Sequence, residues 1–191
     1  MRRSLTLRYR WFLRTKVFKM ELLEDYMSKS DKYVPEKVDE IDVKDLDKKM
    51  FTKDYLFASK PLLMKNMAKE WPAFTKWQNE TYLREMSGDD PIQCETTPLG
   101  KEEFAYFHKD AGSWSKLNFT YGEFLTTIRD PQRKFNIYFA EEDVPGNLHE
   151  DITEPWLAKD LLVFAEKAYW HGIGTVTPPH TDGQENFMCV M

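Results

Sequence analysis

The chain has 191 residues, of which 41% are hydrophobic and 15% aromatic. This is the length of one domain with a substantial core, and it argues against a disordered tail. The net charge of −5 gives no reason to expect nucleic-acid binding, which depends on Lys and Arg contacting phosphates. Cys94 and Cys189 lack CxxC spacing, which argues against a disulfide framework or a zinc site. No apolar run approaches the roughly 18 residues that span a bilayer.

Residues 1–19 form a predicted basic leader, because seven Lys and Arg side chains precede the first acid, Glu21. Their composition resembles that of a mitochondrial transit peptide. The alternative is a non-domain extension, with Met20 as a second start. We expect a cytoplasmic or nuclear protein, with mitochondrial targeting as the alternative.

Residues 20–50 are a charged lead-in, predicted as a surface helix or an extended segment. The domain is expected from residue 51, with a short helix at 51–57 and a buried strand at 61–64. Residues 70–77 are predicted as an aromatic turn, and residues 81–86 as a helix that ends at Ser87-Gly88. Four tryptophans are assigned to packing: Trp71, Trp77, Trp114 and Trp170.

A further helix is predicted to begin at Thr120, because Thr120 and Glu123 have the spacing of a capping box. It should end before Asp130-Pro131. The aromatic and β-branched run 135–140 predicts a strand. Further strands are predicted at 167–170 and 186–191. Strands become denser towards the C-terminus, which predicts an α+β, mostly β domain whose last strand exposes an unpaired edge.

The chemistry is predicted in the run Thr-Val-Thr-Pro-Pro-His-Thr-Asp at 175–182. In an extended segment, residues two apart project to the same side, so His180 and Asp182 would point together. One imidazole and one carboxylate are two corners of the 2-His-1-carboxylate triad that binds iron(II). A bare HxD pair is weak evidence, because short motifs match by chance.

The surroundings of this pair resemble the JmjC-type, cupin-like iron(II)/2-oxoglutarate oxygenases, and especially their asparaginyl-hydroxylase members. The matching residues are Val176, Thr177, Pro178, His180, Asp182, Asn186 and Phe187. A looser resemblance covers residues 40–191. It rests on Lys60-Pro-Leu-Leu-Met64, Trp71-Pro-Ala73, Trp77, Tyr138-Phe-Ala140, Leu148 and Asp151-Ile152.

The resemblance implies a double-stranded β-helix (jelly roll) preceded by helices, with residues 51–191 as its N-terminal part. It implies iron(II) and 2-oxoglutarate as cofactor and cosubstrate, with His180 and Asp182 as metal ligands. Thr177 and Asn186 would contact the cosubstrate, and Tyr138 would reach it from a neighbouring strand. Without the resemblance, Thr177 and Asn186 would be interpreted as ordinary turn or strand residues.

The sequence departs from the family pattern in its second histidine ligand, which the family places far downstream of HxD. The histidines are His108, His149, His171 and His180, and none follows the pair. His171 is disfavoured as a substitute because the family pattern places it in another part of the fold. The family's basic residue for 2-oxoglutarate is also expected beyond Met191.

Two hypotheses follow from this departure. In its full-length form the protein would be an oxygenase that hydroxylates or demethylates a protein or other macromolecule. Alternatively, the chain is a non-catalytic truncated isoform, a fragment or a cupin-like scaffold, and we expect it to be inactive alone. No membrane span is predicted, and the sequence does not indicate an oligomeric state.

Overall fold

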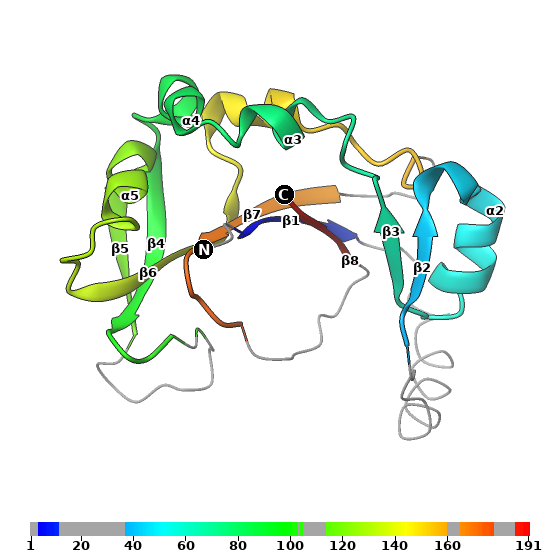
Figure 1. Ribbon diagram of the computed structural model, residues 1–191, viewed down its shortest axis with the longest axis horizontal. Helices are drawn as coiled ribbons and strands as arrows, with labels where there is room; N and C mark the ends of the chain where they lie inside the picture. The colour runs from blue at the N-terminus through cyan, green and yellow to red at the C-terminus, as the bar shows by residue number, and fades with distance from the viewer. Residues whose placement is uncertain (1–3, 12–36, 103, 105–113, 160–164, 178–185) are drawn as a thin grey trace. The chain divides into compact units, whose positions relative to one another are not determined.

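The computed structural model describes residues 4–11, 37–102, 104, 114–159, 165–177 and 186–191. The chain forms two compact units (Figure 1). Unit 1 comprises Met1–Trp11, Glu70–Thr153 and Phe164–Met191, and unit 2 comprises Phe12–Lys69 and Glu154–Val163. The described part of unit 1 is rich in antiparallel strands, which confirms the mostly β prediction.

Unit 1 contains a six-stranded antiparallel sheet in the order β5-β4-β6-β7-β1-β8 (Figure 1). The strands are β1 (Ser4–Trp11), β4 (Pro91–Pro98), β5 (Ser115–Thr120), β6 (Phe135–Asp143), β7 (Ala165–Gly172) and β8 (Asn186–Val190). Three of the strands predicted from the sequence lie in this sheet as β6, β7 and β8, and they are confirmed. Strand β8 ends the sheet order, and its Met188 and Val190 are 57% and 64% exposed.

Strands β1, β4 and β5 were not predicted. In β4, four successive residues from Cys94 to Thr97 are buried, so the alternation that indicates a half-buried strand is missing. Strand β1 lies in the segment interpreted as a basic leader, and it pairs with both β7 and β8. That residues 1–19 are a leader stays a prediction.

Short helices α3 (Pro72–Lys76), α4 (Glu80–Ser87), α5 (Tyr121–Thr127) and η3 (Gly146–Asp151) complete unit 1. The predicted helix at 81–86 is confirmed as α4. The aromatic turn predicted at 70–77 is wrong, because Pro72 starts α3, at a position where its missing N–H costs nothing. Trp71 and Trp77 on either side are buried, as predicted.

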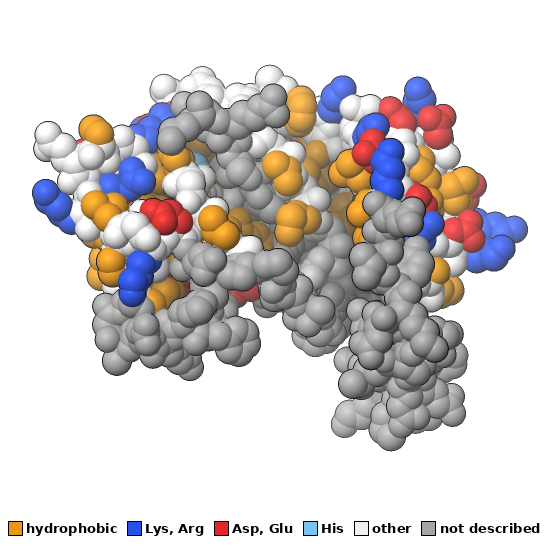
Figure 2. Space-filling model, turned by 60° about the horizontal axis from the view of Figure 1, so that its bottom comes forward, with side chains coloured by type: hydrophobic (Ala, Val, Ile, Leu, Met, Phe, Trp, Pro, Cys, Tyr) orange, Lys and Arg blue, Asp and Glu red, His pale blue; other side chains and the backbone are white. Residues whose placement is uncertain are grey.

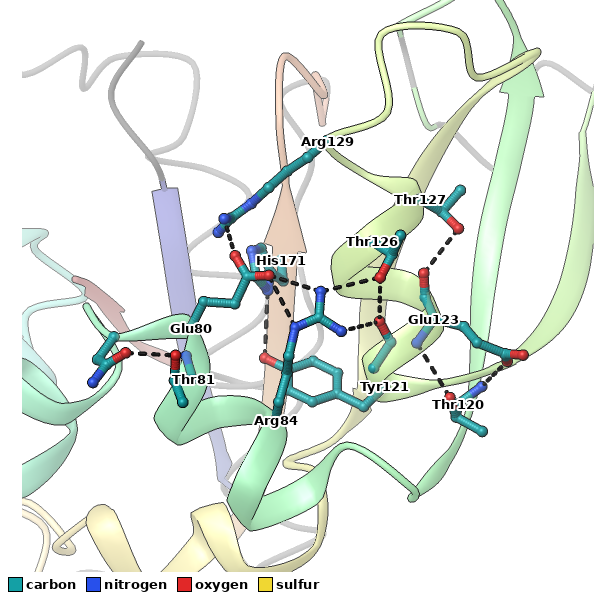
Figure 3. A network of polar contacts seen from close by, with 12 residues as sticks. Glu80, Thr81, Arg84, Thr120, Tyr121, Glu123, Thr126, Thr127, Arg129 and His171 are labelled. Carbon is teal, nitrogen blue, oxygen red and sulfur yellow. Dashed lines mark hydrogen bonds and ion pairs between the residues drawn. The ribbon is translucent and has the colours of Figure 1, made fainter.

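Helix α5 begins with the predicted capping box (Figure 3). The Thr120 hydroxyl accepts a hydrogen bond from the Glu123 N–H at 3.2 Å, and the Glu123 carboxylate accepts one from the Thr120 N–H at 2.7 Å. Arg84 joins α4 to this helix by donating to the Gly122 carbonyl at 2.8 Å. A Cβ at Gly122 would lie 2.9 Å from the Gly88 carbonyl oxygen, so this close approach requires glycine.

Unit 2 contains a parallel pair, β2 (Asp39–Asp42) and β3 (Leu62–Lys65), with η1 (Val43–Asp45), α2 (Lys48–Met50) and the π-helix η2 (Phe51–Leu56). The predicted helix at 51–57 is confirmed as η2. The buried strand predicted at 61–64 is wrong in its burial, because Leu63 is 49% exposed. In the described part of unit 2, β3 belongs to a sheet of two strands, and alternate side chains of β3 are exposed to solvent.

Exposed hydrophobic side chains are interspersed with charged ones (Figure 2). In unit 1 they include Leu99, Trp114 and Leu117. Trp114 is 39% exposed, so its assignment to packing was wrong, whereas Trp170 is 7% exposed. Across the described residues, no helix is both long and apolar enough to cross a membrane.

Candidate functional site

One face of the sheet in unit 1 carries the predicted site residue Tyr138. Tyr138 on β6 lies opposite Gly172 on β7 and opposite Glu95 on β4. Residues opposite each other in an antiparallel pair project to the same face, so these residues define the site face, together with Asn136 and Trp170 at neighbouring even positions. Trp170 packs there with Ala140, Ala168 and the partly buried Tyr138.

The opposite face is the aromatic core of unit 1. Tyr121 and Phe124 of α5 contact Phe139 of β6, and Trp77 packs edge-on against Tyr169 at 5.6 Å. Fully burying such a side chain contributes about 2 kcal/mol to folding. The core fixes β6 and β7, and thereby the backbone that carries the site face.

His171 belongs to this core. It is 4% exposed, and its Nδ1 lies 3.2 Å from the Tyr169 hydroxyl. The Tyr121 hydroxyl lies 3.5 Å from the same nitrogen (Figure 3). Burial raises the pKa of both tyrosines, so both phenols stay protonated at neutral pH. The neighbouring residue Gly172 is on the site face, so the His171 ring points away from Tyr138.

Gly172 forms a close-packed cradle with two side chains. A Cβ at Gly172 would overlap the Thr175 hydroxyl and lie 2.9 Å from Cδ2 of Tyr138. The Tyr138 ring and the Thr175 side chain therefore both approach the same side of this glycine. The phenol of Tyr138 is thus held beside the segment that leads into the predicted metal-binding run.

That segment is fixed by two backbone hydrogen bonds. The Val176 N–H donates to the Glu102 carbonyl at 2.9 Å, and the Phe104 N–H donates to the Val176 carbonyl at 2.9 Å. Thr177, the predicted cosubstrate contact, follows directly and is exposed. The predicted ligands His180 and Asp182 lie outside the described residues.

Asn186, the other predicted cosubstrate contact, opens β8 and is exposed. Through β1 it lies in register with Glu166 of β7, because Arg10 pairs with both. Glu166 is six residues from Gly172, or about 20 Å along a strand. The structure brings Tyr138 and the segment before Thr177 together but does not place Asn186 beside them. Its role stays a prediction.

Glu95 is a site-face residue that the sequence analysis missed. It is 6% exposed, and burial raises the pKa of its carboxyl above its ordinary value of 4.5, although Trp114 and Lys116 partly offset the shift. No sequence motif indicates Glu95, because it is one of 32 acidic residues in the chain. A buried carboxylate opposite Tyr138 is a group that can meet a cation.

We predict that Glu95→Gln is more stable than the wild type at pH 7. A raised carboxyl pKa means that the folded state binds the proton more tightly, so this group's contribution to stability falls as pH rises above about 4.5. The amide lacks this cost and can still accept a hydrogen bond. Thermal unfolding at a series of pH values measures the difference in stability between the two proteins. This difference should vanish below pH 4.5. An advantage independent of pH would contradict the prediction.

The described cysteines offer no nucleophile. Cys94 and Cys189 are both free, and burial raises the pKa of both thiols, that of Cys189 to about 11. Within the described ranges, no three His, Cys, Asp or Glu side chains are grouped so that they could hold a metal ion. The described chemistry of the site face is therefore a phenol, hydroxyls, an amide and a carboxylate.

The fold defines this chain as a mostly β domain, and one face of its larger sheet carries polar side chains. Residues 47–191 match the family described as "Cupin-like domain". The chain therefore belongs to the cupin-like, JmjC-type family, which the sequence analysis had recognised.

Similar proteins carry related names. The chain is 32% identical to "Lysine-specific demethylase 8" of Xenopus tropicalis over 151 residues, covering 72% of this chain and 30% of that protein. It is 28% identical to "Lysine-specific demethylase JMJ30" of Arabidopsis thaliana over 145 residues, covering 72% and 32%. It is 26% identical to "JmjC domain-containing protein D" of Dictyostelium discoideum over 161 residues, covering 73% and 34%. The chain spans about a third of the length of these curated relatives.

Proposed function

We propose that the cupin-like domain is part of an iron(II)/2-oxoglutarate-dependent oxygenase that modifies a protein. The observation that carries the proposal is the position of Tyr138. Its ring packs against Gly172 beside Thr175, and the chain continues from there through Thr177 into His180-Thr-Asp182. A phenol and hydroxyls next to a His-x-Asp pair are what an anionic cosubstrate of iron(II) needs.

The donor set fits iron(II), because imidazole and carboxylate together are the ligand types of its oxygenase sites. His180 and Asp182 would hold the metal, with at least one further ligand completing the set. When bound, iron(II) supplies a template that brings cosubstrate and oxygen together at its open positions. Tyr138 and Thr177 would donate hydrogen bonds to carboxylate oxygens of 2-oxoglutarate, because a buried anion without donors is costly.

The proposed substrate is a protein side chain that carries positive charge. Two of the relatives described above are named lysine-specific demethylases, which supports a basic residue as the target. Hydroxylation of a carbon atom and removal of an N-methyl group remain the two possible outcomes. Mass spectrometry of a basic peptide separates them by the gain of one oxygen atom or the loss of a methyl group.

The test is the conversion of 2-oxoglutarate to succinate by the full-length protein. We expect conversion that requires iron(II). Tyr138→Phe should raise the KM for 2-oxoglutarate roughly tenfold to a hundredfold while largely preserving kcat, because a hydrogen bond to a charged group contributes about 1.5–3 kcal/mol.

Tyr55→Phe is the matched control, because the Tyr55 hydroxyl donates instead to Asp39 in unit 2. Its KM should equal that of the wild type. Succinate formation that is independent of iron(II), or no formation with any protein substrate, would refute the proposed function and favour a non-catalytic scaffold.

A further inference from the structure

Asn136 is a buried amide that the proposed mechanism does not use. It lies on the site face of β6, two residues before Tyr138, and is 7% exposed. Its Nδ2 donates to the Pro98 carbonyl at 2.9 Å, to the Lys101 carbonyl at 3.1 Å and to the Thr97 hydroxyl at 3.3 Å. The Asn136 side chain therefore forms hydrogen bonds with both ends of the segment that follows β4.

The segment from Pro98 to Lys101 is a tight turn. The Lys101 N–H donates to the Pro98 carbonyl at 3.1 Å, and Gly100 adopts φ +83°, as the third position of a type II turn requires. Thr97 adds a hydrogen bond from its hydroxyl to the Lys101 carbonyl at 2.5 Å. Asn136 thus ties this turn to the sheet from within the site face.

Two contacts carry this anchoring to the predicted site. Glu102, directly after the turn, and Phe104 form the backbone hydrogen bonds that hold Val176, the residue before Thr177. The Phe104 ring, 6% exposed, packs edge-to-face on Tyr138 with ring centroids 5.2 Å apart. The same short segment therefore contacts Tyr138 and the residue that precedes Thr177.

We propose that Asn136 is a positioning residue for 2-oxoglutarate, acting through the Pro98–Lys101 turn and Phe104 on Tyr138 and Thr177. This inference rests on the proposed function and adds a residue that touches neither cosubstrate nor metal. Packing and hydrogen bonds of this kind are what hold binding groups in a productive geometry. Loss of Asn136 should leave the turn formed by its own bonds but let it move relative to β6.

The experiment compares Asn136→Ala and Asn136→Asp with the wild type in two measurements. Hydrogen exchange of the Phe104 and Val176 amides in the metal-free protein reports on the anchoring itself. The KM for 2-oxoglutarate against kcat reports on positioning. The aspartate keeps the volume but replaces the NH₂ donor by an acceptor that faces carbonyl oxygens, so both variants should behave alike.

We expect faster exchange at both amides, and a KM for 2-oxoglutarate raised roughly tenfold with kcat largely preserved. Gln93→Ala is the matched control, because it removes an exposed hydrogen bond that the Gln93 side chain on β4 donates to the Asn118 side chain on β5. It should change neither measurement. If Asn136→Ala does not fold, Phe104→Leu is the second variant, because it keeps the backbone hydrogen bonds but removes the ring contact with Tyr138. It should raise the KM for 2-oxoglutarate and leave the amide exchange unchanged.

Unchanged exchange at Phe104 and Val176 would overturn the inference, whatever the cosubstrate does. Faster exchange with an unchanged KM, in a protein that does turn over 2-oxoglutarate, would overturn it as well. If the wild type itself does not use 2-oxoglutarate, the proposed function fails and the positioning role fails with it. The exchange result would then still show whether Asn136 anchors the turn.

Discussion

Replacing Gly172 with alanine is expected to disturb the candidate site directly, because the added methyl group meets both Thr175 and Tyr138. The added Cβ would overlap the Thr175 hydroxyl and stand 2.9 Å from Cδ2 of Tyr138, which is closer than carbon atoms normally approach. Because Gly172 has no positive φ, the effect would be steric and not conformational. We expect a loss of about 2 kcal/mol, typical of overpacking, together with weaker 2-oxoglutarate binding because Tyr138 must move.

Two controls separate this cause from others. Gly174→Ala meets no atom within 4 Å but has φ +70°, so it should lose only about 1–2 kcal/mol of backbone energy and leave the KM unchanged. The double variant Gly172→Ala/Thr175→Ala removes the clash with the Thr175 side chain but keeps the close approach to Tyr138, so it should regain part of the loss. Chemical denaturation measures the stability of the three variants, and steady-state kinetics measures their KM for 2-oxoglutarate. A double variant no better than the single one would show that Thr175 is not the obstacle.

Replacing Asp151 with alanine is expected to give the largest loss of stability in unit 1. The Asp151 carboxylate is 2% exposed and accepts hydrogen bonds from Lys76 at 2.7 Å, Trp77 at 3.0 Å and Tyr82 at 2.7 Å. It thereby joins η3 to the ends of α3 and α4. Alanine would leave the buried Trp77 N–H without an acceptor, so we expect a loss of about 3 kcal/mol and a melting temperature roughly 6–12 °C lower.

The pH dependence of this loss provides a second check. Burial raises the pKa of Asp151, but the hydrogen bonds from Lys76, Tyr82 and Trp77 outweigh it and leave the pKa below its ordinary value of 3.8. The stabilisation is therefore complete above pH 3.8 and is lost as pH falls through the lowered pKa. Glu150→Ala, an exposed neighbour, is the control. A difference between wild type and Asp151→Ala that persists in strong acid would contradict this explanation.

The parts of the fold that could be predicted carry their signal in local sequence. The capping box at Thr120 and Glu123 encodes a helix start in four residues, and the aromatic run of β6 has strand composition throughout. Strand β4 could not be predicted in this way, because its residues from Cys94 to Thr97 are buried on both faces and mix polar with apolar side chains. Its burial depends on strands far away in sequence.

The same distinction applies to the candidate site. The metal ligands were proposed from family resemblance, because the two-residue spacing of His180 and Asp182 is weak evidence by itself. Tyr138 was proposed from family resemblance, and the register of β6 with β7 places it opposite Gly172. Glu95 and Asn136 could not be found, since their burial on the site face arises only when β4, β6 and β7 pair. Long-range pairing, and not local pattern, creates those environments.

The most direct test of the account is an oxygen-free titration of the full-length protein with iron(II) in the presence of 2-oxoglutarate. We predict saturable binding of one equivalent of iron(II), abolished in Asp182→Ala and His180→Ala. His149→Ala, which removes an exposed imidazole of η3, should bind like the wild type. Equal binding by the wild type and Asp182→Ala, or no binding by the wild type, would contradict the assignment of His180 and Asp182 as the metal ligands.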